Sequence, residues 1–89
     1  MGTLYGFAYH DKALEFLQSL GKKLRRQIAN RIQKLAANPT PKGYKILKGV
    51  KDGTDSIYRI RQGDHRILYV IRNPVIVILD IDNRKDVYR

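Results

Sequence analysis

The sequence predicts an α+β fold in which two N-terminal helices pack on one face of a small, twisted, mainly antiparallel β-sheet. Between residues 13 and 35, apolar residues recur every three or four positions, which is the spacing of helices buried on one side. From about residue 45 onward the spacing changes to two, which is typical of strands. Because the chain has 89 residues, we expect one domain that spans residues 1–89.

The first half of the chain predicts one strand and the two helices. Residues 4–9 mix aromatic and small apolar residues and predict a short strand. Residues 11–20 predict a helix that ends at Gly21, because glycine is favoured just after a helix. A longer helix is expected over residues 22–37, and the two prolines of residues 38–41 end it.

The second half predicts strands joined by hairpins. Residues 48–55 contain two glycines and predict a loop, and Gln62-Gly63-Asp64 and Asn73-Pro74 predict turns. The β-branched run near the end is suited to a buried strand inside the sheet. The expected strands span residues 45–47, 56–61, 65–72 and 75–81.

Charge and composition narrow the possible functions. The chain has 18 basic and 8 acidic residues, a net charge of +10, which attracts polyanions such as nucleic acid or an acidic protein. The alternative is a basic protein whose charge serves solubility alone. The absence of cysteine excludes disulfide and thiolate chemistry and suits a reducing cytosol. Because we find no secretory signal and no run of about 20 apolar residues, we expect a cytoplasmic protein.

A group of arginines on the first hairpin defines a candidate site. Residues two apart on a strand project from the same face, so Arg59 and Arg61 point one way, and Tyr58 and Ile60 point towards the core. Arg66 lies just past the turn, near Arg61 across the hairpin. A phosphate between guanidinium groups would relieve their repulsion by accepting forked hydrogen bonds. The alternative is a solvated face on which the arginines pair with Asp52, Asp55, Asp64 or Asp82.

Metal and cofactor chemistry has little support. His10 and His65 have no further ligands nearby to complete a zinc site, and two carboxylates, Asp80 and Asp82, make a poor site for a divalent ion. Neither a nucleophile elbow nor a glycine-rich phosphate loop is present. We therefore expect no metal and no cofactor. Tyr88 stands among cations in the tail, where it either stacks on an unpaired base or covers an edge of the core.

Four segments of the chain together resemble RelE-type toxins of the RelE/ParE toxin–antitoxin superfamily. They are KILKG at 45–49, YRIR at 58–61, GDHRILY at 63–69 and RKDVYR at 84–89. The resemblance spans essentially the whole chain and implies a RelE-like β-α-α-β-β-β fold. It also implies an endoribonuclease that cleaves messenger RNA in the ribosomal A site, where the ribose 2′-hydroxyl attacks the adjacent phosphate without a metal.

The resemblance assigns roles to two groups of residues. Positively charged groups would neutralise charge that builds on the phosphate, and a tyrosine would orient the nucleotide. The implied catalytic residues are Arg61, Arg66, Arg84 and Tyr88, and the implied RNA-binding residues are Arg59, Lys45, Lys48 and Lys85. An arginine cannot give up its proton near neutral pH, so the general base stays open among Tyr88, Lys85, Lys48 and His65. Asn83 stands where many relatives carry histidine.

The resemblance also implies partners. These are a cognate acidic antitoxin, messenger RNA and the ribosome. In the absence of the antitoxin, the toxin is expected to be a monomer. Two other functions stay open: a ParE-like toxin that poisons DNA gyrase, and a catalytically weakened relative that binds RNA or antitoxin. The arginine cluster favours the ribonuclease, because a gyrase poison has no need of it.

Overall fold

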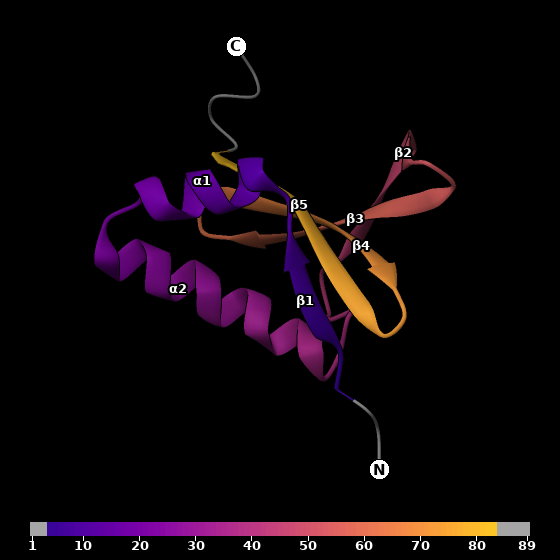
Figure 1. The fold of residues 1–89 in the computed structure, drawn as a ribbon, viewed down its shortest axis with the longest axis horizontal. Coiled ribbons are helices and arrows are strands. Elements are labelled where there is room, and N and C mark those ends of the chain that lie inside the picture. Colours follow the sequence, from indigo (N-terminus) through magenta and orange to yellow (C-terminus); the bar gives the residue numbers. More distant parts are fainter. Residues whose placement is uncertain (1–3, 84–89) are drawn as a thin grey trace.

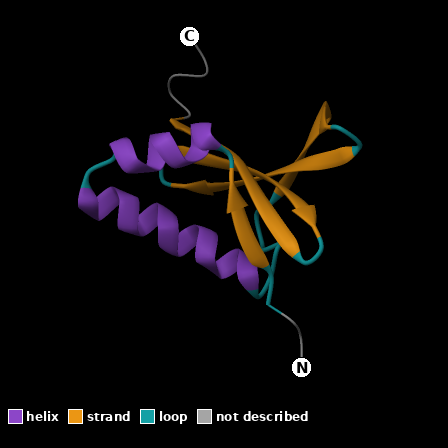
Figure 2. Cartoon of the chain, viewed as in Figure 1, coloured by secondary structure: helices purple, strands orange, loops and turns teal. Residues whose placement is uncertain are grey.

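A computed structural model describes residues 4–83 (Figure 1). Both helices lie on the same side of one sheet, as Figure 2 shows, which confirms the predicted α+β fold. No helix among these residues is long and apolar enough to cross a membrane. In chain order the elements are β1 (Gly6–Tyr9), α1 (Asp11–Ser19), α2 (Lys22–Gln33), a 3₁₀ turn η1 (Lys34–Ala36), β2 (Lys45–Asp52), β3 (Asp55–Gln62), β4 (His65–Arg72) and β5 (Val75–Asn83).

The sheet has five strands in the order β1-β5-β4-β3-β2. The pairs β2–β3, β3–β4 and β4–β5 are antiparallel, as expected for a series of hairpins, and β1 pairs with β5 in parallel. The sheet is therefore mainly antiparallel, as predicted, with β5 inside it. The predicted helix over residues 22–37 is also confirmed in outline, because α2 continues into η1 before the chain turns.

The loop predicted over residues 48–55 is wrong. Strand β2 continues to Asp52, and the turn to β3 is made by Gly53 and Thr54 alone, with Gly53 at φ 63°. The register of β2 shifts between Ile46 and Lys51. An irregularity of this kind breaks the period of two in the sequence although the strand goes on. The expected short strand was thus the regular first part of a longer one.

The main core lies between the helices and the sheet. Side chains of Ile28 and Ile32 from α2 meet Ile60, Ile67 and other strand residues, and all of these are fully buried. Burial of each such side chain contributes about 1.5 to 3 kcal/mol. The hydroxyl of Tyr69, also fully buried, donates a hydrogen bond to the carbonyl of Pro39 at 2.6 Å. This bond ties the central strand to the segment that follows the helices.

The opposite side of the sheet, which we call the helix-free face, carries a smaller apolar cluster. It contains Ile57, Val70 and Val77, each at most 9% exposed. The alternation of the strands places arginines on the same face. On β3 and β4 the residues of the helix-free face are Ile57, Arg59, Arg61, Arg66, Leu68, Val70 and Arg72.

Candidate nucleic-acid interface

The strand register brings the predicted cations together on the helix-free face. Arg61 lies directly opposite Arg66 in the pairing of β3 with β4, and Lys45 lies directly opposite Arg59 in the pairing of β2 with β3. Directly opposed residues of antiparallel strands project to the same side. Four of the residues predicted for the site therefore share one side of the sheet, and Tyr58 takes the other side, next to the main core.

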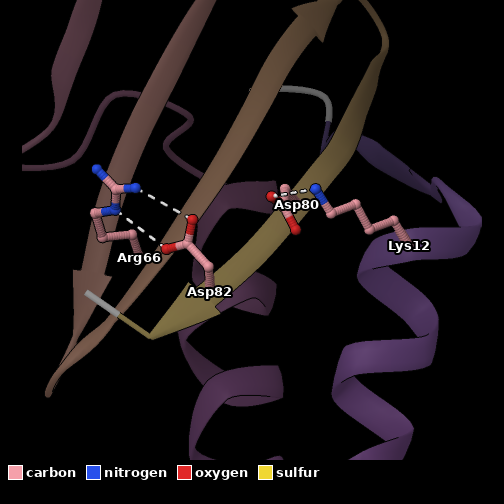
Figure 3. A network of polar contacts seen from close by, with 4 residues as sticks. All are labelled: Lys12, Arg66, Asp80 and Asp82. Carbon is pink, nitrogen blue, oxygen red and sulfur yellow. Dashed lines mark hydrogen bonds and ion pairs between the residues drawn. The ribbon is translucent and has the colours of Figure 1, made fainter. Parts of the chain in front are cut away.

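Arg66 is held by an acidic residue of the next strand. Its Nε donates to Oδ1 of Asp82 and its Nη2 donates to Oδ2, both at 3.1 Å (Figure 3). The two side chains are 15% and 27% exposed. Two parallel hydrogen bonds between charged groups fix the plane of a guanidinium. Arg66 therefore forms one of the arginine–aspartate pairs that the sequence offered as the alternative to phosphate binding. The same pair orients its guanidinium.

A register shift creates this pairing. Leu68 lies opposite Asp80 and Tyr69 lies opposite Ile78, so Leu79 is an extra residue in β5. Without this bulge the register of the β4–β5 hairpin would bring Ile81 opposite Arg66. With it, Asp82 faces Arg66 and Ile81 turns into the core, where it is 1% exposed. The bulge therefore places a carboxylate on the helix-free face, next to Arg66.

Arg72 makes a similar arrangement at the far end of β4. Its guanidinium contacts Asp55 at 2.7 Å and Asp52 at 3.0 Å. The hydrogen bond that Arg72 donates to Asp55, together with the charge of that carboxylate, raises the pKa of Arg72. On β5, Asp80 pairs with Lys12 of α1 at 3.3 Å (Figure 3). Four aspartates near the arginines are thus engaged with cations: Asp52, Asp55, Asp80 and Asp82.

The other predicted residues lie elsewhere. Lys48 is exposed in the irregular part of β2. Arg84, Lys85 and Tyr88 fall outside the described residues. His65 is 8% exposed and its ring lies 5.8 Å from that of Phe16, on the helix-covered side of the sheet. It is two residues from Ile67 and shares its face, so His65 is removed as a candidate base for chemistry on the helix-free face.

Two features of the region were not predicted. The Nε of Arg31 in α2 donates to the carbonyl oxygen of Arg61 at 3.1 Å, which ties the helix to the strand that carries the site. A row of aromatic rings also runs from Tyr44 through Tyr58 to Tyr69, with centroids 5.8 and 5.6 Å apart. Both join residues distant in the sequence, so no local pattern indicated them. Among residues 4–83 no group of three His, Cys, Asp or Glu side chains is placed to hold a metal ion.

The sequence matches known proteins. Residues 7–88 match the family model described as the ParE toxin of the type II toxin–antitoxin system parDE. A curated protein of Methanocaldococcus jannaschii that carries the name RelE1 is 32% identical over 82 residues, which cover 90% of each chain.

Solved structures of toxin–antitoxin complexes contain chains with the same fold. A chain of the archaeal RelE–RelB complex from Pyrococcus horikoshii is 30% identical and superposes with a TM-score of 0.75 over 91% of this chain and 96% of that chain. A chain of the RelBE2 toxin–antitoxin complex from Mycobacterium tuberculosis, 23% identical, superposes with a TM-score of 0.77 over 94% and 95% of the two chains, and shows the same fold.

Two helices packed on a mixed five-stranded sheet are the fold of RelE-like toxins. The chain belongs to the RelE/ParE family of type II toxin–antitoxin toxins and is of the RelE type. The resemblance found in the sequence is thereby confirmed.

Proposed function

We propose that this toxin is a ribosome-dependent endoribonuclease that cleaves messenger RNA in the A site. The observation that carries the proposal is the direct opposition of Arg61 and Arg66 on the helix-free face, with Arg59 and Lys45 beside them. Guanidinium groups at this spacing are suited to hold a phosphodiester, because each can donate two hydrogen bonds to phosphate oxygens. The same cluster has no evident use in a toxin that acts by binding a protein.

The proposed reaction is a transesterification. A base takes the proton of the ribose 2′-hydroxyl, the 2′-oxygen attacks the adjacent phosphorus, and the bond from phosphorus to the 5′-oxygen breaks. The products are a 2′,3′-cyclic phosphate and a 5′-hydroxyl, which receives a proton. Arg66 and Arg84 would neutralise the charge that grows on the phosphate, and Tyr88 would orient the nucleotide. With His65 on the other side of the sheet, Tyr88, Lys85 and Lys48 remain candidates for the base.

Partners follow from the same proposal. The relatives from Pyrococcus horikoshii and Mycobacterium tuberculosis were solved as complexes of toxin and antitoxin. We infer that this chain, as one domain and as a free monomer, also binds a cognate antitoxin. An acidic segment is attracted by the net charge of +10 and gains further by covering apolar surface. A toxin that acts on translating ribosomes works in the cytoplasm.

The proposal is tested by mapping new 5′ ends after expression from a tightly controlled promoter. One reporter transcript is made in two copies, and a single changed start codon prevents translation of the second. Cuts are expected within the reading frame of the translated copy alone, and Arg66→Ala or Arg84→Ala should abolish them. Intact transcripts together with DNA-damage signalling would instead indicate a gyrase poison and contradict the proposal.

A further inference from the structure

The net charge of this protein is concentrated in one part of the chain. All 8 acidic residues lie outside residues 16–51, whereas 10 of the 18 basic residues lie inside this segment. The remaining 8 basic and 8 acidic residues balance each other. The arginines of β4 belong to the balanced part, since Arg66 and Arg72 are paired with aspartates. Of the ten basic residues in the segment, Lys45 and Lys48 on β2 belong to the proposed site, whereas six lie in α2 and η1. The part of the excess charge carried by α2 and η1 therefore lies away from the proposed cleavage site.

Helix α2 displays much of this excess to solvent. It contains no acidic residue. Within residues 4–83, its exposed cations and the one that follows it in η1 form no ion pair. We call this surface the α2 basic face; it consists of Lys22, Lys23, Arg25, Arg26 and Lys34, all exposed.

These charges do not serve the stability of the helix. Lys22 and Lys23 occupy its first turn, where the helix dipole favours acidic residues and disfavours cations by about 0.3 to 1 kcal/mol each. The N-cap is Gly21, which offers no side-chain hydrogen bond to the first turn. A helix under selection for stability alone would carry the opposite charge here. Departures from local preference of this kind are expected at functional surfaces.

The surroundings favour nucleic acid over protein as the occupant. The apolar side chains of α2, Ile28 and Ile32, are fully buried, and Leu24 packs against the same core. The large apolar side chains exposed within residues 4–83 all lie outside α2. Protein interfaces have an apolar or aromatic centre that is depleted of charge, whereas a phosphate backbone is held mainly by Lys and Arg. The α2 basic face has the Lys and Arg side chains that hold a phosphate backbone and lacks the apolar centre of a protein interface.

We propose that the α2 basic face binds the phosphate backbone of structured ribosomal RNA and so docks the toxin on the ribosome. The helices cover the side of the sheet opposite the helix-free face, as Figure 1 shows, so one particle would be held by α2 while the messenger reaches the arginines from the other side. The inference rests on the proposed function for the identity of the particle. The charge distribution itself is independent of that function.

Matched double variants test the inference. Lys22→Gln with Lys23→Gln removes two charges from the α2 basic face, and Lys42→Gln with Lys51→Gln removes two exposed lysines elsewhere in residues 16–51. Each variant loses two positive charges from a net +10. The long-range electrostatic field of the protein therefore changes by the same amount in both. Binding of the full-length proteins to purified ribosomes carrying a messenger is measured over a series of salt concentrations, and thermal melts check folding.

The α2 pair is expected to weaken ribosome binding about tenfold at 0.1 M salt. It should also reduce the slope of log affinity against log salt by about 1.5, because each lost phosphate contact accounts for about 0.7 to 0.9. The control pair should change the slope by less than about 0.5. Cleavage at saturating ribosome concentration should be unchanged in both variants, and binding of the free messenger should be weakened equally by both.

Three results would overturn the inference. Equal losses in the two variants would assign the effect to net charge, and unchanged binding in the α2 pair would remove this face from docking. Weaker binding of poly-glutamate by the α2 pair, with ribosome binding intact, would make it a surface for an acidic protein. If the wild-type protein neither binds nor cuts on ribosomes, the proposed function fails as well, so the two failures are distinguishable.

Discussion

Asp82 holds Arg66 through two hydrogen bonds of 3.1 Å, while Arg61 lies directly opposite Arg66 on the neighbouring strand. The carboxylate balances one of two adjacent positive charges, which otherwise repel each other in the free protein. It also fixes the guanidinium plane before any RNA arrives. Preorganised charge of this kind costs no reorganisation during the reaction. Asp82 is therefore a positioning residue for the proposed chemistry.

Replacement of Asp82 separates positioning from binding. Asp82→Ala should lower the cleavage rate at saturating ribosomes about tenfold, because a guanidinium that loses its orientation stabilises the transition state less well. RNA affinity should rise, since one negative charge leaves the face. Single-turnover cleavage of ribosome-bound messenger measures both quantities. In the double variant with Arg66→Ala, the loss of Asp82 should have no further effect on the rate. Additive losses would show that Asp82 acts independently of Arg66.

The turn between β3 and β4 sets the register that opposes Arg61 to Arg66. Gly63 adopts φ 61°, which side chains disfavour, and a Cβ at this position would meet no atom within 4 Å. Gly63→Ala should therefore destabilise the protein by about 1 kcal/mol through backbone strain alone. Gly63→Asn should cost less, because asparagine tolerates this conformation. Chemical denaturation of the two variants checks the order, and equal stability of both with wild type would contradict it.

Alkaline pH should destabilise the fold through Tyr69. Burial, and to a lesser degree the neighbouring Tyr58, raise the pKa of Tyr69, and burial also raises the pKa of Tyr9. A raised folded-state pKa means that the stabilisation is complete below the unfolded value of about 10 and is lost as the pH rises from there through the folded pKa.

Tyr69→Phe tests this assignment. The substitution should cost about 1 kcal/mol at neutral pH, because the hydrogen bond to Pro39 is lost. Above pH 10 the free energy of unfolding should fall less steeply in the variant than in wild type, and part of the fall should remain because of Tyr9. Denaturant titrations between pH 7 and 11.5 provide the comparison. Parallel curves for the two proteins would show that the Tyr69 hydroxyl is not responsible.

Local alternation allowed the arginines of the helix-free face to be predicted. Residues 56–61 and 65–72 follow a period of two with few breaks, so the shared side of Arg59 and Arg61, and the place of Arg66 across the hairpin, follow from the sequence. The helices could be predicted equally well, because their apolar stripes are regular. These elements position four of the residues assigned to the site.

Bulges set the limit of such prediction. Because the register of β2 is irregular, its second part was predicted as a loop. In β5, the extra residue Leu79 decides which side chain faces Arg66. A shift of one residue exchanges the two faces of a strand, and no local pattern marks where it occurs. The contact of Arg31 with Arg61 is likewise set by the packing of α2 on the sheet. These relations depend on tertiary structure.

The guanidinium of Arg66 is proposed to act on the messenger, and β4 supplies a matched comparison. Arg66 and Arg72 lie on the same face of one strand, about 20 Å apart, and both are paired with aspartates. The decisive measurement is the single-turnover rate of cleavage of ribosome-bound messenger by purified Arg66→Ala and Arg72→Ala proteins. We predict a loss of about 10²- to 10³-fold for Arg66→Ala and a change of less than about twofold for Arg72→Ala. Equal rates in the two variants would contradict the account.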